Sequence, residues 1–136
     1  MAAARWPLQH GKPVVEIVLV LAQGATRLVR TLLADTGAGP RHGAFELILD
    51  ENDCLLCGGK PHQQADLGGA YAGTFPVYLI RVQIPALAFD HDLLAVGVGS
   101  PPLGLDGIAG FRFLSRFTYG NFGDPDQFGL ESLPNT

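Results

Sequence analysis

Short runs of apolar residues alternate along the chain with clusters of glycine, proline and polar residues. Residues 14–21 are rich in β-branched residues and predict a strand, and residues 28–33 predict a second one. Residues 23–26 between them have turn composition, so the two strands are expected to form a hairpin. Further runs with strand character are residues 45–49, 71–84, 93–98, 118–122 and 127–130.

Two short helices are also predicted. Asp50 is a suitable N-cap for a helix over residues 51–57, and Gly58 is a suitable stop. Residues 111–117 continue an apolar spacing that is helical. The pattern therefore describes many short strands with little helix.

The remaining segments read as connections. Residues 1–12 are expected to be a loose lead-in, residues 60–66 a polar loop, and residues 85–92 a turn region. Pro76 falls inside a predicted strand, which favours an edge strand or a break at that point.

Composition supports an all-β class. The chain has 136 residues, of which 47% are apolar and 16% charged, with 18 glycines and 10 prolines. That length suits one domain, placed at residues 13–136 after the lead-in. The net charge of −4 gives no basic stripe for nucleic acid and no patch for a membrane surface. No targeting segment is recognisable, so a cytoplasmic protein is expected.

The stretch that organises the chain is Asp35-Thr36-Gly37-Ala38, directly after an apolar run. It is expected to leave a buried strand and to turn at the glycine. A carboxylate in that place sits at the mouth of a core, where burial and neighbouring groups can tune its chemistry.

A second segment, Ile108-Ala109-Gly110, opens the predicted C-terminal helix, and Gly68-Gly69 lies near the tip of a predicted hairpin. Together with residues 35–38, these features resemble the retroviral-type (retropepsin-like) aspartic proteases and their bacterial and cellular relatives. The resemblance spans roughly residues 13–122. It implies an acid-protease barrel with one or two short helices and a glycine-tipped flap hairpin. One departure is that Phe111, rather than arginine, follows the glycine.

The resemblance implies aspartic-type endopeptidase activity on extended polypeptides. Two facing carboxylates share one proton, so that one activates a water and the other binds the peptide carbonyl. The chain contains a single Asp-Thr-Gly, so the second Asp35 is expected from a second copy in a symmetric homodimer. No cofactor and no metal are expected.

Each residue of the motifs carries a role by this resemblance. Asp35 is the expected catalytic carboxylate. The expected supporting and substrate-binding residues are Thr36 bonding across the dimer, Gly37 allowing close approach, Ala38 lining the cleft floor, and Gly68, Gly69 and Ala70 closing over the peptide.

Ala38 leads to an expectation about pH. A serine in its place could donate a hydrogen bond to the ionised carboxylate pair, whereas alanine cannot. The pair is therefore expected to titrate higher and to work nearer neutral pH.

Three other readings stay open. Asp35 could simply stabilise a turn, which is the common use of aspartate beside glycine, and the chain would then be an inactive dimerising or peptide-binding module. Cys54 and Cys57 form a C-x-x-C pair that could serve redox or metal chemistry, although structural thiols are favoured. Asp106 also precedes a glycine and could be mistaken for a second catalytic aspartate, but a structural turn role is favoured for it.

Overall fold

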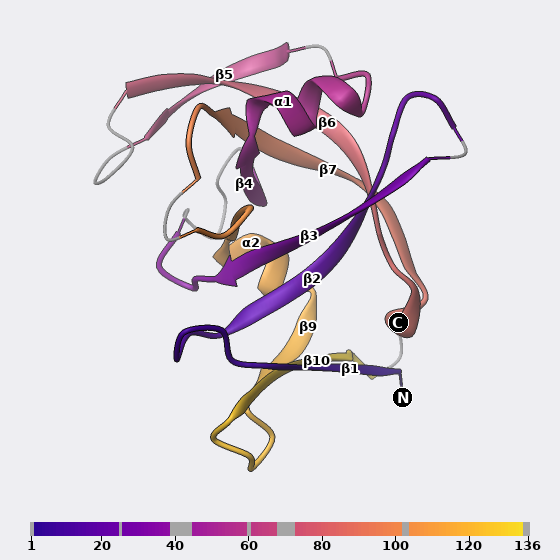
Figure 1. The fold of residues 1–136 in the computed structure, drawn as a ribbon, viewed down its shortest axis with the longest axis vertical. Coiled ribbons are helices and arrows are strands. Elements are labelled where there is room, and N and C mark those ends of the chain that lie inside the picture. The colour runs from indigo at the N-terminus through magenta and orange to yellow at the C-terminus, as the bar shows by residue number, and fades with distance from the viewer. Residues whose placement is uncertain are drawn as a thin grey trace.

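The computed structural model describes residues 2–24, 26–38, 45–59, 61–67, 73–101 and 104–134. It is mostly β, with 57% strand, 11% helix and two short α-helices. The elements in chain order are β1 (Ala3–Pro7), β2 (Val14–Val20), β3 (Arg27–Ala34), β4 (Leu47–Asp50), α1 (Glu51–Leu56), β5 (Pro61–Leu67), β6 (Gly73–Ile84), the 3₁₀ helix η2 (Pro85–Leu87), β7 (Phe89–Val98), β8 (Gly107–Ala109), α2 (Phe111–Leu114), β9 (Phe117–Gly120) and β10 (Gln127–Ser132) (Figure 1).

Six strands close into a barrel in the order β2-β3-β8-β4-β7-β6, and β6 returns to pair with β2. β5 adds to the outer side of β6. Closure leaves most strands paired on both sides, so few backbone groups are exposed at an edge. The expectation of an all-β barrel is confirmed.

The predicted first hairpin is present, with Val14 paired to Leu33 and Val20 to Arg27 in an antiparallel register. Its core face follows the two-residue period of a strand, because Val15, Ile17 and Leu19 are all fully buried. The β-branched composition of this run is thus explained by burial inside the barrel.

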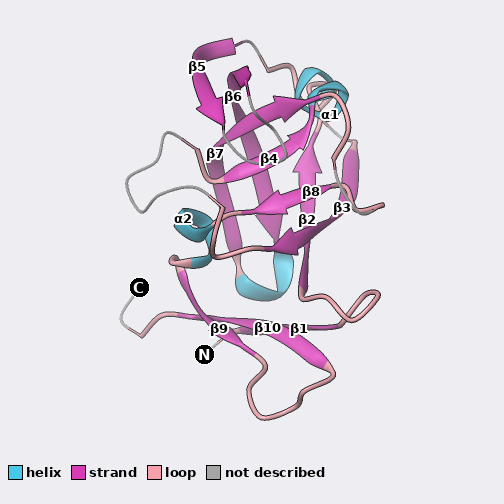
Figure 2. Ribbon diagram, turned by 90° about the vertical axis from the view of Figure 1, so that its left-hand side faces the viewer, coloured by secondary structure: helices cyan, strands magenta, loops and turns pink. Residues whose placement is uncertain are grey.

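The placement of β8 decides where the two sequence motifs meet. β8 lies between β3 and β4, parallel to the first and antiparallel to the second (Figure 2). A Cβ on Gly107 would come 2.2 Å from the carbonyl oxygen of Ile48, so only glycine lets the strand fit there. Because β3 and β8 run parallel, Asp35 and Gly110 follow the same ends of neighbouring strands.

The terminal strands form a second sheet in the order β1-β10-β9, below the barrel in both overall views (Figures 1 and 2). The expectation of a loose lead-in at residues 1–12 is therefore wrong over Ala3–Pro7. This segment pairs with β10, and Ala4 packs inward opposite Leu130. The pairing spans more than a hundred residues of sequence, which a local pattern does not reveal.

The predicted polar loop at residues 60–66 is also wrong, since Pro61–Leu67 form β5 and pair with β6. β5 lies at the edge of the sheet, where polar side chains remain in solvent and hide the strand signal.

Pro76 does not break β6. It pairs with Gln64 of β5, and the pairing of β6 with β7 starts only at Val77, so the missing N–H falls where one side is open.

Two predicted boundaries shift. The expected turn at residues 85–92 is shorter, because η2 ends at Leu87 and β7 already begins at Phe89. The expected helix at residues 111–117 ends at Leu114, since Phe117 joins β9. The terminal hairpin is present as β9 and β10.

Helix α1 forms as predicted from its caps. The Asp50 side chain accepts the N–H of Asn52 at 2.8 Å. Gly58 takes a positive φ of 75° just after the helix, a conformation that glycine adopts without strain. Within the described ranges, no helix has the length and apolar character that crossing a membrane requires.

Candidate functional site

The Asp35 loop, residues 35–38, begins where β3 ends. The Asp35 N–H donates to the carbonyl of Ala109 at 2.9 Å, and its own carbonyl accepts the N–H of Ala38 at 3.1 Å. Its carboxylate oxygen Oδ1 accepts the Gly37 N–H at 2.9 Å. The residue is half-buried. These bonds fix the turn while leaving part of the carboxylate open to solvent.

The segment after β8 closes against this loop. The Phe111 N–H donates to the Ala38 carbonyl at 3.0 Å, and the Gly110 N–H donates to the Glu46 carbonyl at 2.9 Å. A Cβ on Gly110 would lie 2.7 Å from the Ala38 oxygen and 3.2 Å from the Glu46 oxygen. Glycine is therefore required at this contact, and it joins the two motifs that the sequence singled out.

The other predicted site residues divide into three groups. Ile108 and Ala109 are buried in β8 as part of the core. Thr36 is exposed, and Ala38 is half-buried against an apolar cluster that includes Phe45. The predicted flap residues Gly68, Gly69 and Ala70 lie outside the described residues, although β5 and β6 on either side of them pair as a hairpin.

An ion pair between a buried carboxylate and a partly exposed arginine, which sequence reasoning missed, supports the loop. Glu46 is 4% exposed, and its carboxylate receives two bonds from Arg116, Nε to Oε2 at 2.6 Å and Nη2 to Oε1 at 2.8 Å. This hydrogen-bonded pairing raises the pKa of the Arg116 guanidinium. The pair ties the residue that binds Gly110 to the segment after α2. A single charge inside the apolar run at residues 45–49 was the available signal.

A second missed pair joins the barrel to α1. Asp53 is 5% exposed, and Arg30 reaches it with Nε at 2.7 Å from Oδ2 and Nη2 at 3.1 Å from Oδ1. The hydrogen bond to Asp53 raises the pKa of Arg30. Both charges are thereby neutralised where β3 meets the helix.

Asp106 has a structural place, at the other end of the β3–β8 pair from Asp35. Its Oδ2 accepts the N–H of Thr31 at 2.9 Å, and its own N–H donates to the Thr31 carbonyl at 2.9 Å. It secures the start of β8 against β3, in agreement with the turn role favoured from the sequence.

The two cysteines are free thiols, Cys54 buried and Cys57 half-buried. Burial, followed by the neighbouring Cys57 and acidic groups, raises the pKa of Cys54 to about 12. Burial and then Asp53 raise the pKa of Cys57 to about 11. A thiol must ionise to act as a nucleophile or a metal ligand, so these surroundings oppose both uses. The described residues contain no cluster of three or more His, Cys, Asp or Glu side chains that could hold a metal ion.

The chain matches no protein-family model and no curated protein. The fold and the site therefore define the class of protein at the level of a closed six-stranded β-barrel. At one end of two parallel strands, this barrel presents a half-buried aspartate in an Asp-Thr-Gly turn.

Proposed function

We propose that the protein is a retropepsin-like aspartic endopeptidase that acts as a symmetric homodimer. The observation that carries this proposal is the junction between the Asp35 loop and the Gly110 segment. Backbone bonds from Asp35 to Ala109 and from Phe111 to Ala38 hold the two motifs together at one end of the barrel. A carboxylate on such a loop is fixed in place without being fully buried.

The chemistry needs two such loops facing each other across a two-fold axis. Two carboxylates a few ångströms apart cannot both ionise easily, so they share one proton. The ionised partner takes a proton from the attacking water, and the protonated partner donates a hydrogen bond to the peptide carbonyl. As the water oxygen bonds to the carbonyl carbon, the C–N bond breaks and the proton taken from the water passes to the leaving nitrogen. The products are a carboxylic acid and an amine, the pair again shares one proton, and no metal is required.

The state of the Asp35 side chain supports this use. Among the described residues, its Oδ1 accepts only the Gly37 N–H, and no cation pairs with the carboxylate. Thr36 beside it is exposed and makes no hydrogen bond through its hydroxyl within the described part of the chain. Both side chains are thus available to a second copy and to a substrate.

The proposed substrate is an extended polypeptide. β5 lies on the outer side of the barrel strand β6 (Figure 1), and at Gly73–Pro76 strand β6 pairs with β5 alone. Extended chains bind next to strands through backbone hydrogen bonds, while side-chain pockets provide selectivity.

A second candidate function is an inactive dimerising or peptide-binding module. One observation favours it: the bond from the Gly37 N–H to Asp35 Oδ1 is the local contact that a purely structural turn aspartate makes. In that case Asp35 would shape the loop and would not touch a reacting group.

Cleavage of an unstructured peptide library across pH separates the two candidates. The parent is expected to cleave, and Asp35→Asn is expected to lower the rate by about 10³-fold or more. Asp92→Asn, the same change at an exposed position of β7, is the matched control and should keep the parent rate. Equal cleavage by the parent and Asp35→Asn would exclude Asp35 as the catalyst. A dimer that binds peptides without cutting them would favour the second candidate. A strict monomer on sizing would contradict the assembled site.

A further inference from the structure

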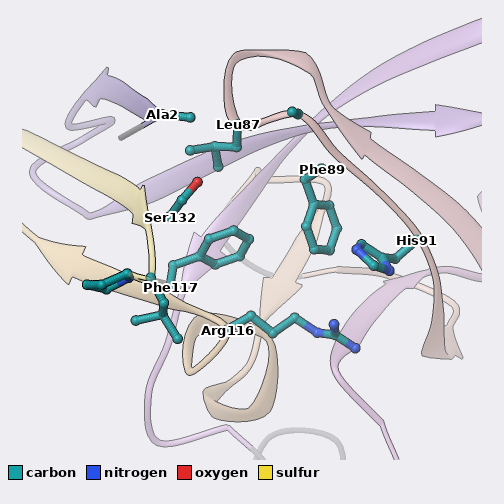
Figure 3. Close-up of a pocket in the computed structure, with 10 residues that line it drawn as sticks. Ala2, Leu87, Phe89, His91, Arg116, Phe117 and Ser132 are labelled. Carbon is teal, nitrogen blue, oxygen red and sulfur yellow. The ribbon is translucent and has the colours of Figure 1, made fainter. Parts of the chain in front are cut away.

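A pocket of about 680 Å³ lies away from the Asp35 loop, between the start of β7 and the segment that leads from α2 into the terminal sheet (Figure 3). None of its described lining residues belongs to that loop. Its lining includes Leu87, Phe89, His91, Arg116, Phe117 and Ser132.

The ionisable side chains of this lining are all basic. They are His91 and Arg116, and none of the described lining residues is acidic. Asp90 and Asp92 flank His91 in sequence, but side chains alternate along a strand, so they belong to the opposite face of β7. Asp90 is in addition held by Arg81 at 2.7 Å. Within the part of the chain that the structure describes, the pocket lining therefore presents nitrogen donors and no carboxylate of its own.

Arg116 keeps one side of its guanidinium for the pocket. Glu46 occupies Nε and Nη2, and Nη1 has no acceptor among the described residues. The side chain of Arg116 is 37% exposed, whereas that of Glu46 is 5% exposed. The buried Glu46 carboxylate thus holds the guanidinium through Nε and Nη2, while Nη1 remains open to the pocket.

The walls beside these donors are apolar and aromatic. Phe89 and Phe117 lie with ring centroids 5.3 Å apart, and the His91 ring lies 4.6 Å from that of Phe89. In Figure 3 the side chains of Phe89, His91 and Arg116 converge on one part of the pocket, with Leu87 and Ser132 across from them. An apolar body could pack on the rings while its charged end meets the donors.

We propose that this pocket binds a small carboxylic acid whose body is aromatic or branched and apolar. The carboxylate accepts hydrogen bonds from Nη1 of Arg116 and from the His91 ring, and the body packs against Phe89 and Phe117. The volume lies within the range of small-molecule sites, which combine mostly apolar walls with a few convergent polar groups. The proposal does not rest on the peptidase assignment, because no residue of the Asp35 loop takes part.

Titration calorimetry with 3-phenylpropionate tests the proposal, with 3-phenylpropionamide as the matched probe that has the same body and no charge. The acid is expected to bind at least about tenfold more tightly than the amide, because the charged hydrogen bonds are lost with the amide. Asp35→Asn should bind the acid as the parent does, which separates this site from the proposed catalytic one.

Variants locate the binding. Ser132→Phe fills the pocket and should abolish it, and His91→Ala should weaken it about fivefold. Thr118→Phe places the same ring on the exposed outer face of β9 and is the control that should bind normally. A short peptide ending in a free phenylalanine carboxylate tests chain ends as the source of the same chemistry.

Equal affinity for the acid and the amide would overturn the anion site, and so would an absence of binding by either. Unchanged binding in both Ser132→Phe and His91→Ala would place the ligand elsewhere. Tighter binding of the peptide than of the free acid would overturn the small-acid assignment.

Discussion

The Asp35 loop and the two ion pairs with buried carboxylates use their acidic side chains in opposite ways. Asp35 is half-buried and, in the described part of the chain, has one backbone N–H as its side-chain partner. Glu46 and Asp53 are almost fully buried, and each receives two bonds from an arginine. The barrel therefore neutralises these two buried carboxylates and leaves that of Asp35 without a cation among the described residues.

The physical reason is the cost of burying charge. A buried carboxylate without a partner is strongly unfavourable, so Glu46 and Asp53 persist because Arg116 and Arg30 reach them in good geometry. Asp35 avoids that cost by staying partly in water. Removing the arginine of an ion pair should thus lower the stability of the fold, whereas changing Asp35 should lower activity.

Arg116→Met should give the largest loss of stability, because it leaves the buried Glu46 without its cation. We expect the free energy of unfolding to fall by about 3 kcal/mol, measured by urea denaturation. Arg81→Met is the control, since Arg81 and Asp90 are exposed and such pairs contribute little. A variant as stable as the parent would show that the pair has no architectural role.

Gly110→Ala should give the next largest loss of stability. Its new Cβ would press on the Ala38 carbonyl, and overpacking of this kind costs about 2 kcal/mol. Gly99→Ala is the matched control, because a Cβ there meets nothing within 4 Å. If the two variants lose the same stability, the contact between the motifs is not tight.

The thiols should behave as structural groups, like the buried carboxylates. Their raised pKa values, about 12 for Cys54 and about 11 for Cys57, keep both protonated at pH 8. Alkylation at pH 8 should be at least about tenfold slower than for an unfolded control of the same chain, and should speed up as the pH rises. Rapid labelling of the folded protein would revive the thiol-based reading.

Ala38→Ser tests the proposed catalytic pair directly. The new hydroxyl can donate to the ionised form, so the acid limb of the pH–rate profile should move down by up to about one pH unit. The parent measured in parallel is the reference. An acid limb that stays in place, or moves upward, would contradict the expectation of near-neutral activity caused by alanine.

Asp35→Asn should give the smallest change in stability, about 0.5 kcal/mol or less. An asparagine oxygen can still accept the Gly37 N–H, so the turn survives. Asp53→Asn is the same substitution at a buried, paired site and should cost clearly more in urea denaturation. Similar losses at the two positions would remove the distinction between them.

Local sequence patterns determined much of the secondary structure of this protein. The first hairpin, the capped helix α1, the terminal hairpin and the two glycine-containing motifs were predicted because a strand period, a cap or a turn is encoded within a few residues. Asp35 was selected in the same way, from its position after an apolar run and before glycine.

Long-range pairing decided the rest. The insertion of β8 between β3 and β4, the pairing of β1 with β10 and the strand character of β5 depend on partners that no local window contains. Glu46 and Arg116 are 70 residues apart in sequence, and only the closed barrel brings them together. The sequence was enough to single out Asp35. The tertiary structure decided which carboxylates are neutralised, because burial and arginine contacts arise only when distant segments of the chain meet.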